Sequence, residues 1–112
     1  MSKDPVQYIK HMADECSYIL SIRKVLSKDE FLADETLKRA VVRSLEIIGE
    51  AAKKVDVDFR NKWNTIQWKN MAAMRNRLIH DYMGVNYSIV WDVIENKIPE
   101  LNEQIREVLS KE

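Results

Sequence analysis

Residues 75–82 gather the side chains of this chain that are best suited to acid–base chemistry on a phosphate, and they read RNRLIHDY. An unperturbed imidazole titrates near neutrality, so His80 can act as a general base or a general acid. The guanidinium of Arg75 stays protonated, and its planar fork matches phosphate oxygens. Together these groups could hold a phosphodiester, transfer a proton and stabilise the charge of the transition state.

The spacing of these residues indicates which of them can act together. On a helix, Asn76 and His80 lie one turn apart on one face, where the amide can orient the imidazole and fix its tautomer. Arg75 and His80 are five residues apart, which separates them by roughly 140° around a helix. One copy of the chain cannot easily close both side chains over one phosphate, but two copies facing each other could. The residues alone also allow His80 to be an ordinary helix-terminal histidine and Tyr82 to pack the following turn.

The rest of the chain predicts an all-α fold that positions this segment. It has only two glycines and two prolines, and no window alternates as a strand would. The apolar spacing predicts an up-and-down bundle of four main helices. They span Pro5 (capped by Asp4) to about Leu26, residues 34–55, a cap at Asn64 or Thr65 to about His80, and Asn86 to about Leu109 with a kink at Pro99.

Shorter elements and one glycine complete the expected fold. Ser27 and Glu30 form the pattern of a capping box and predict a short helix between the first two main helices. Residues 56–64 lack a clear period and are expected to be the main loop, with room for a turn of helix. Gly49 costs its helix about 1 kcal/mol relative to alanine, so it is expected to let a neighbouring helix pack closely against residues 49–52.

Length and composition predict one domain, residues 1–112, large enough to bury a core without metal or disulfide support. Cys16 stands alone and is expected in the core, as in a protein of the reducing cytoplasm. The first residues do not resemble a signal peptide, and no stretch is apolar enough to span a bilayer. A phosphate-binding glycine loop, a zinc-binding histidine pair and a nucleophile elbow are all missing, so we expect neither metal nor cofactor.

Charge is balanced overall, with 18 basic and 18 acidic residues, but residues 59–80 carry bases and no acid. The bases, which we take as candidate RNA contacts besides Arg75, are Arg60, Lys62, Lys69 and Arg77. They alternate with Phe59, Trp63 and Trp68, a mixture that could contact phosphates and stack on unpaired bases. The same aromatic residues could instead belong to the core or, with Trp91, to a dimer interface.

The segment at residues 75–82 also resembles the motif of the HEPN superfamily, in which an arginine, a polar residue and a short spacer precede a histidine. With the Tyr82 that follows, the segment resembles the motif of the HepT branch, whose pattern is Arg, four to six residues, His, any residue, Tyr. The resemblance extends along the chain in the same order: IGEAA at 48–52, Trp68, IVW at 89–91 and IPEL at 98–101.

The resemblance implies a metal-independent ribonuclease that acts as the toxin of a HepT/MntA-type toxin–antitoxin pair in the cytoplasm. Two protomers would share one cleft in which Arg75 binds the scissile phosphate, His80 transfers a proton and Asn76 orients the reacting groups. Tyr82 would accept adenylate from a partner nucleotidyltransferase of the MntA type, which would silence the enzyme. Two alternatives remain: a non-catalytic nucleotide- or RNA-binding module that assists such a partner, and a purely structural dimeric bundle.

Overall fold

The structure, a computed structural model, describes residues 4–80 and 84–112, and every regular element in them is a helix. The helices are α1 (Pro5–Val25), α2 (Lys28–Ala33), α3 (Glu35–Lys54), α4 (Val57–Lys62), α5 (Trp68–His80), α6 (Tyr87–Asn96) and α7 (Ile98–Lys111). The all-α prediction is therefore confirmed. None of these helices combines the length and the apolarity that crossing a bilayer requires.

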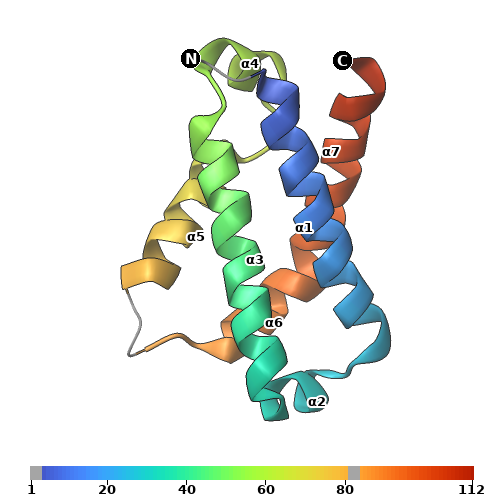
Figure 1. Cartoon of the computed structure of the whole chain (residues 1–112), viewed down its shortest axis with the longest axis vertical. Helices are drawn as coiled ribbons and strands as arrows, with labels where there is room; N and C mark the ends of the chain where they lie inside the picture. Colours follow the sequence, from blue (N-terminus) through green and yellow to red (C-terminus); the bar gives the residue numbers. More distant parts are fainter. Residues whose placement is uncertain (1–3, 81–83) are drawn as a thin grey trace.

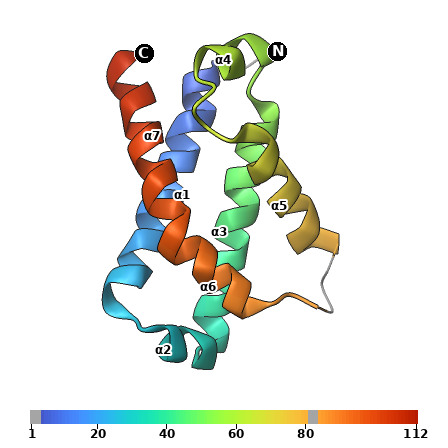
Figure 2. The same ribbon diagram turned by 180° about the vertical axis from the view of Figure 1, so that it is seen from behind.

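Successive long helices run in alternating directions (Figure 1). From the end of the molecule that carries α4, α1 descends to α2, α3 returns, α5 descends again, and α6 and α7 climb back. Helix α3 is the central element, because α1 packs against one side of it and α5 against another. Helix α7 lies along α1, as the reverse view also shows (Figure 2). Helix α5 thus depends mainly on α3 for its position.

Several helix boundaries follow the predicted caps. The side chain of Asp4 accepts a hydrogen bond from the backbone of Val6, with Pro5 in the first turn of α1. Ser27 and Glu30 form the complete capping box of α2. Asn86 accepts hydrogen bonds from the first turn of α6. At each of these points a side-chain oxygen satisfies backbone N–H groups that have no partner inside the helix.

The segment expected to be the main loop is largely a helix. Residues 57–62 form α4, because Asp56 caps it by accepting a hydrogen bond of 2.8 Å from the Phe59 N–H. The predicted cap of the following helix at Asn64 or Thr65 is wrong, since α5 begins only at Trp68. Between the two helices a turn buries Ile66, and Gln104 of α7 donates to the Thr65 carbonyl. Contacts across the fold therefore set the start of α5.

The kink predicted near Pro99 divides the last helix into α6 and α7. A proline has no N–H to donate to the preceding turn, and its ring crowds the carbonyl there. The backbone still donates from Lys97 to Val93 and from Leu101 to Lys97, so the two helices follow one another with a single residue between them.

The core consists mainly of apolar residues of α1, α2, α3, α5, α6 and α7, and it includes two of the tryptophans. Trp68 and Trp91 are only 6% and 7% exposed, and the Trp91 ring packs on Phe31 with centroids 5.3 Å apart. Trp63 is half-buried, and its indole donates to Glu112. The expectation that the tryptophans offer apolar surface for association is therefore wrong for Trp68 and Trp91 and stays a prediction for Trp63, and Trp68 has no free face for stacking on bases.

The single thiol lies in the same core. Cys16 is completely buried, and this burial raises the pKa of its thiol to about 12, with a smaller contribution from the neighbouring Glu15 carboxylate. Cys16 is the core residue that its surroundings in the sequence predicted.

Gly49 marks the closest approach of α5 to α3. A Cβ atom at this position would collide with the Cβ of Arg75 and would stand 2.8 Å from the backbone oxygen of Met71. The predicted close packing against residues 49–52 is thus confirmed, and the helix that packs there is the one that carries the candidate catalytic residues.

Candidate active site

Arg75 lies on the side of α5 that faces α3, and its guanidinium is held at both ends. Its Nη2 lies 3.4 Å from Oε1 of Glu50, on α3. Its Nη1 donates to Oδ1 of the adjacent Asn76 over 3.2 Å. The Nε atom is buried and makes no hydrogen bond within the described residues. A side chain with four rotatable bonds before its guanidinium group is therefore fixed in one direction.

The site is partly open to solvent. The side chains of Arg75 and Glu50 are 24% and 36% exposed, so neither charge is sealed in the interior. An ion pair in such a setting contributes little to folding stability, typically below about 1 kcal/mol. An arginine that is partly exposed and contacts a single carboxylate and an amide retains N–H groups that can bind a phosphate oxygen.

The other half of the predicted catalytic pair lies at the end of the same helix. Helix α5 extends to His80, so Arg75 and His80 belong to one helix and the separation of roughly 140° between the two positions applies. The side chain of His80, the predicted Asn76–His80 pairing and the modification residue Tyr82 lie outside the described residues. Asn76 contacts Arg75, a partner that the sequence analysis did not assign to it.

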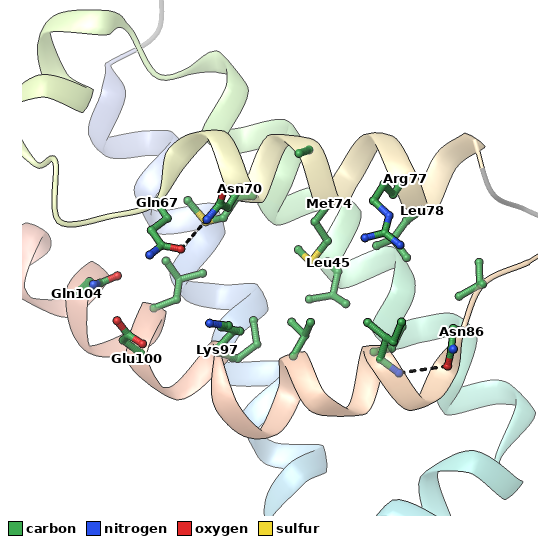
Figure 3. A pocket seen from close by; sticks show the side chains of 18 of the residues that line it. Leu45, Gln67, Asn70, Met74, Arg77, Leu78, Asn86, Lys97, Glu100 and Gln104 are labelled. Carbon is green, nitrogen blue, oxygen red and sulfur yellow. Dashed lines mark hydrogen bonds between the residues drawn. The ribbon is translucent and has the colours of Figure 1, made fainter.

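A cleft of about 420 Å³ lies between α5 and the α6–α7 pair (Figure 3). Most of its lining is apolar, and Leu45 of α3 and Met74 and Leu78 of α5 point into it, while polar residues that include Gln67, Glu100 and Gln104 line one end. Arg77 lines the cleft. Since Arg75 instead contacts α3, the two arginines act on different sides of α5, as a spacing of two residues on a helix requires.

The outer face of α5 is exposed and carries little bulk at its centre. Lys69, Ala73, Asn76 and Arg77 are all exposed. Ala73 lies in the middle of this group, with only a methyl group, so another helix could approach α5 closely there. Hereafter we call these four residues the outer face of α5.

The remaining candidate RNA contacts do not form one surface with Arg75. Arg60 and Lys69 line a second, shallower recess where α4 meets the start of α5. Lys62 lies 2.7 Å from the carboxylate of Glu112, and its hydrogen bond, followed by that of Trp63, holds the pKa of that carboxyl below its usual value. Among the predicted cations, Lys62 is thus already neutralised by an acid.

Metal binding has no support in the part of the chain that the structure describes, where no cluster of three His, Cys, Asp or Glu side chains could hold an ion. The residue that sequence reasoning missed is Glu50. It lies within the IGEAA segment, but only the packing of α5 on α3 reveals that its carboxylate meets Arg75, 25 residues later. A glutamate directly after a glycine that permits helix contact was the available signal.

Comparison with known proteins finds relatives that are described as ribonucleases. Residues 12–108 match the family model described as ribonuclease HepT-like. A protein of Caldanaerobacter subterraneus subsp. tengcongensis with the description "Putative RNase" is 47% identical over 98% of both chains. A protein of Methanocaldococcus jannaschii with the same description is 40% identical over 96% of this chain and 88% of its own. The "Probable ribonuclease HepT" of Thermococcus cleftensis is 36% identical over 90% of this chain and 92% of its own. No solved structure matches with significant similarity.

Proposed function

Because this chain belongs to the HepT-like ribonuclease family, we propose that it is a metal-independent endoribonuclease and the toxin of a type VII-like toxin–antitoxin pair. The observation that carries the proposal is the fixed guanidinium of Arg75 on the helix that also bears His80. A preoriented cation and a group that titrates near neutrality are the two components that RNA cleavage without metal requires.

The proposed reaction uses the ribose 2′-hydroxyl as the nucleophile. His80 takes the proton from this hydroxyl or gives a proton to the departing 5′-oxygen, and the 2′-oxygen attacks the adjacent phosphorus. The bond from phosphorus to the 5′-oxygen breaks, which leaves a 2′,3′-cyclic phosphate on the upstream product and a 5′-hydroxyl on the downstream one. Arg75 binds the scissile phosphate and stabilises its added negative charge, while Asn76 keeps the guanidinium in place.

We propose that the active form is a homodimer whose protomers meet at Ala73, in the centre of the outer face of α5, with Lys69 and Arg77 left at its two ends. The angle between the Arg75 and His80 positions on one helix supports a site that takes residues from both copies. The exposed Ala73 supports close approach of two α5 helices, since it adds no bulk between them. Trp68 and Trp91 do not contribute, because they are buried in the core.

RNA would extend beyond the scissile phosphate along basic residues of the same region. Arg77 and Lys69 belong to the outer face of α5, and Arg60 lies beside Lys69 in the second recess. These cations would bind the phosphates of neighbouring nucleotides without reading sequence. Lys62 would contribute after giving up Glu112.

Regulation would act at Tyr82, through a partner nucleotidyltransferase of the MntA type. Transfer of adenylate to the phenol would place a negative phosphate and a bulky nucleoside two residues from His80. The modification would compete with RNA for Arg75 and Arg77 by charge and by volume.

The test is RNA cleavage by purified Arg75→Ala and His80→Ala variants in the presence of a chelator. Both should lose cleavage by at least about 100-fold, with an unchanged helical circular dichroism spectrum. Arg43→Ala is the matched control, because Arg43 is another arginine of the chain that pairs with a glutamate of α3, Glu46, and it is exposed. It should cleave like the wild type.

Two results would contradict the proposal. A His80→Ala variant as fast as the wild type would exclude the proton-transfer role, and cleavage abolished by the chelator would indicate a metal-dependent reaction. A wild-type protein that binds RNA tightly and cleaves none would favour the non-catalytic binding module instead.

A further inference from the structure

Glu50 is the only carboxylate within ion-pairing distance of Arg75 in the described residues, and the fold brings the two together where α3 and α5 are closest. The Arg75 Cβ packs directly over Gly49, and the adjacent Glu50 meets the guanidinium at the other end of the same side chain. Two consecutive residues of α3 thus hold the arginine, Gly49 at its Cβ and Glu50 at its guanidinium.

This arrangement is not explained by stability. Both side chains are partly exposed, and an ion pair of this kind with a distance of 3.4 Å contributes little to folding. It is not explained by affinity for RNA either, because a carboxylate beside the guanidinium repels a phosphate and competes with it for the same N–H groups. Since the ion pair favours neither folding nor RNA binding, its effect is on the orientation of the Arg75 guanidinium.

Orientation is costly for a free arginine. A long side chain that must be ordered when substrate arrives gives up rotamer entropy at that moment. A guanidinium already fixed by Glu50 at Nη2 and by Asn76 at Nη1 avoids this loss, and its remaining N–H groups point in a set direction. The carboxylate also limits how tightly the ground state binds, so more of the interaction is left for the transition state, in which the phosphate carries more charge.

We propose that Glu50 is a positioning residue of the ribonuclease centre, which holds the Arg75 guanidinium ready for the scissile phosphate. The proposal depends on the function proposed above. Glu50 does not contact substrate and transfers no proton; it acts through Arg75.

The experiment compares Glu50→Ala, Glu50→Gln and Glu46→Ala with the wild type. Glu46 is the matched control, a glutamate one turn earlier on α3 that pairs with Arg43 over 3.5 Å. Steady-state cleavage of a short RNA gives kcat and KM, and the affinity for a 2′-O-methyl RNA of the same sequence gives binding without reaction. Thermal unfolding of each variant checks the fold.

In Glu50→Ala, kcat should fall about 10- to 100-fold, whereas KM and the Kd for the 2′-O-methyl RNA should stay the same or decrease. Glu50→Gln keeps an oxygen that can accept from Nη2, so it should retain kcat within about threefold of the wild type. Glu46→Ala should match the wild type in all three quantities. A loss of packing alone would not lower kcat while tightening RNA binding, nor be rescued by glutamine.

Each other outcome has a definite meaning. A Glu50→Ala variant with wild-type kcat, or one whose defect lies only in a raised KM, overturns the positioning role while leaving the proposed ribonuclease intact. A defect in Glu46→Ala equal to that in Glu50→Ala also overturns it, because the effect would then not pass through Arg75. A wild-type protein without cleavage activity refutes the proposed function, and the positioning role falls with it.

Discussion

Replacing Gly49 by alanine should destabilise the protein and displace Arg75, the arginine that we propose to be catalytic. The added methyl group would overlap the Cβ of Arg75 and stand 2.8 Å from the Met71 backbone oxygen. Neither atom is the end of a flexible side chain, so α5 as a whole must move away from α3. Overpacking of this kind costs about 2–3 kcal/mol.

The same substitution has a favourable component. Alanine is a better helix former than glycine by about 1 kcal/mol, and residue 49 is inside α3. The net loss should therefore be about 1–2 kcal/mol, which lowers Tm by about 4–8 °C in a chain of this size. Because the shift of α5 carries Arg75 away from Glu50, RNA cleavage should fall by at least about tenfold.

Thermal unfolding followed by circular dichroism, together with the cleavage rate, measures both effects. Gly84→Ala is the matched control, since a Cβ at residue 84 would meet nothing within 4 Å, and it should change Tm by less than about 2 °C. A Gly49→Ala protein with a raised Tm and full activity would contradict this prediction. It would mean that the gain in helix propensity exceeds the cost of overpacking and that α5 is not held against Gly49.

Three further predictions follow from the same structure. Tyr82→Phe should cleave RNA like the wild type but gain no adenylate mass when it is co-expressed with a nucleotidyltransferase of the MntA type, so it should stay toxic. Adenylate mapped instead to Tyr87, whose ring lies under the Lys38 ammonium, would defeat the assignment. Light scattering of the wild type at micromolar concentration should give the mass of a dimer, and a monomeric wild type would contradict the shared site. Ala73→Arg should give a monomer without cleavage activity, whereas Ala33→Arg, at an exposed position of α2, should change neither the mass nor the activity. Cys16 should resist alkylation in the native protein at pH 8, because its pKa of about 12 keeps the thiol neutral, and rapid native labelling at pH 8 would argue against that burial. Its contribution to folding stability should be complete below about pH 9 and should decline between about pH 9 and 12, because in that range the thiol ionises in the unfolded chain but not in the folded protein.

Much of the fold could be predicted because local chemistry determines it. Asp4, Ser27 and Asn86 are side-chain caps that act on N–H groups two or three residues away, so the helix starts that they set can be recognised in the sequence. Gly49 could be interpreted for a similar reason, since a glycine inside a good helix needs a partner that approaches closely.

The features that the sequence did not predict depend on distant contacts. The start of α5 at Trp68 follows a turn that buries Ile66 and binds Gln104, which comes from α7. Trp68 and Trp91 could have been surface or core, and only the packed helices decide the choice. The Arg75–Glu50 pair joins residues 25 positions apart on two helices, and no local pattern indicates which carboxylate will meet the arginine. The placement of the His80 and Tyr82 side chains stays a prediction.

A pair of matched substrates tests whether the protein cleaves RNA by using the 2′-hydroxyl group of the RNA as the nucleophile. Purified wild-type protein in the presence of a chelator is mixed with a fluorescent oligoribonucleotide or with its all-2′-deoxy counterpart, and the products are identified by mass spectrometry. The RNA should be cleaved to leave a 2′,3′-cyclic phosphate on the upstream fragment, and the deoxy strand should not be cleaved. Cleavage of both strands, or an RNA left intact by the dimeric wild-type protein, would contradict this prediction.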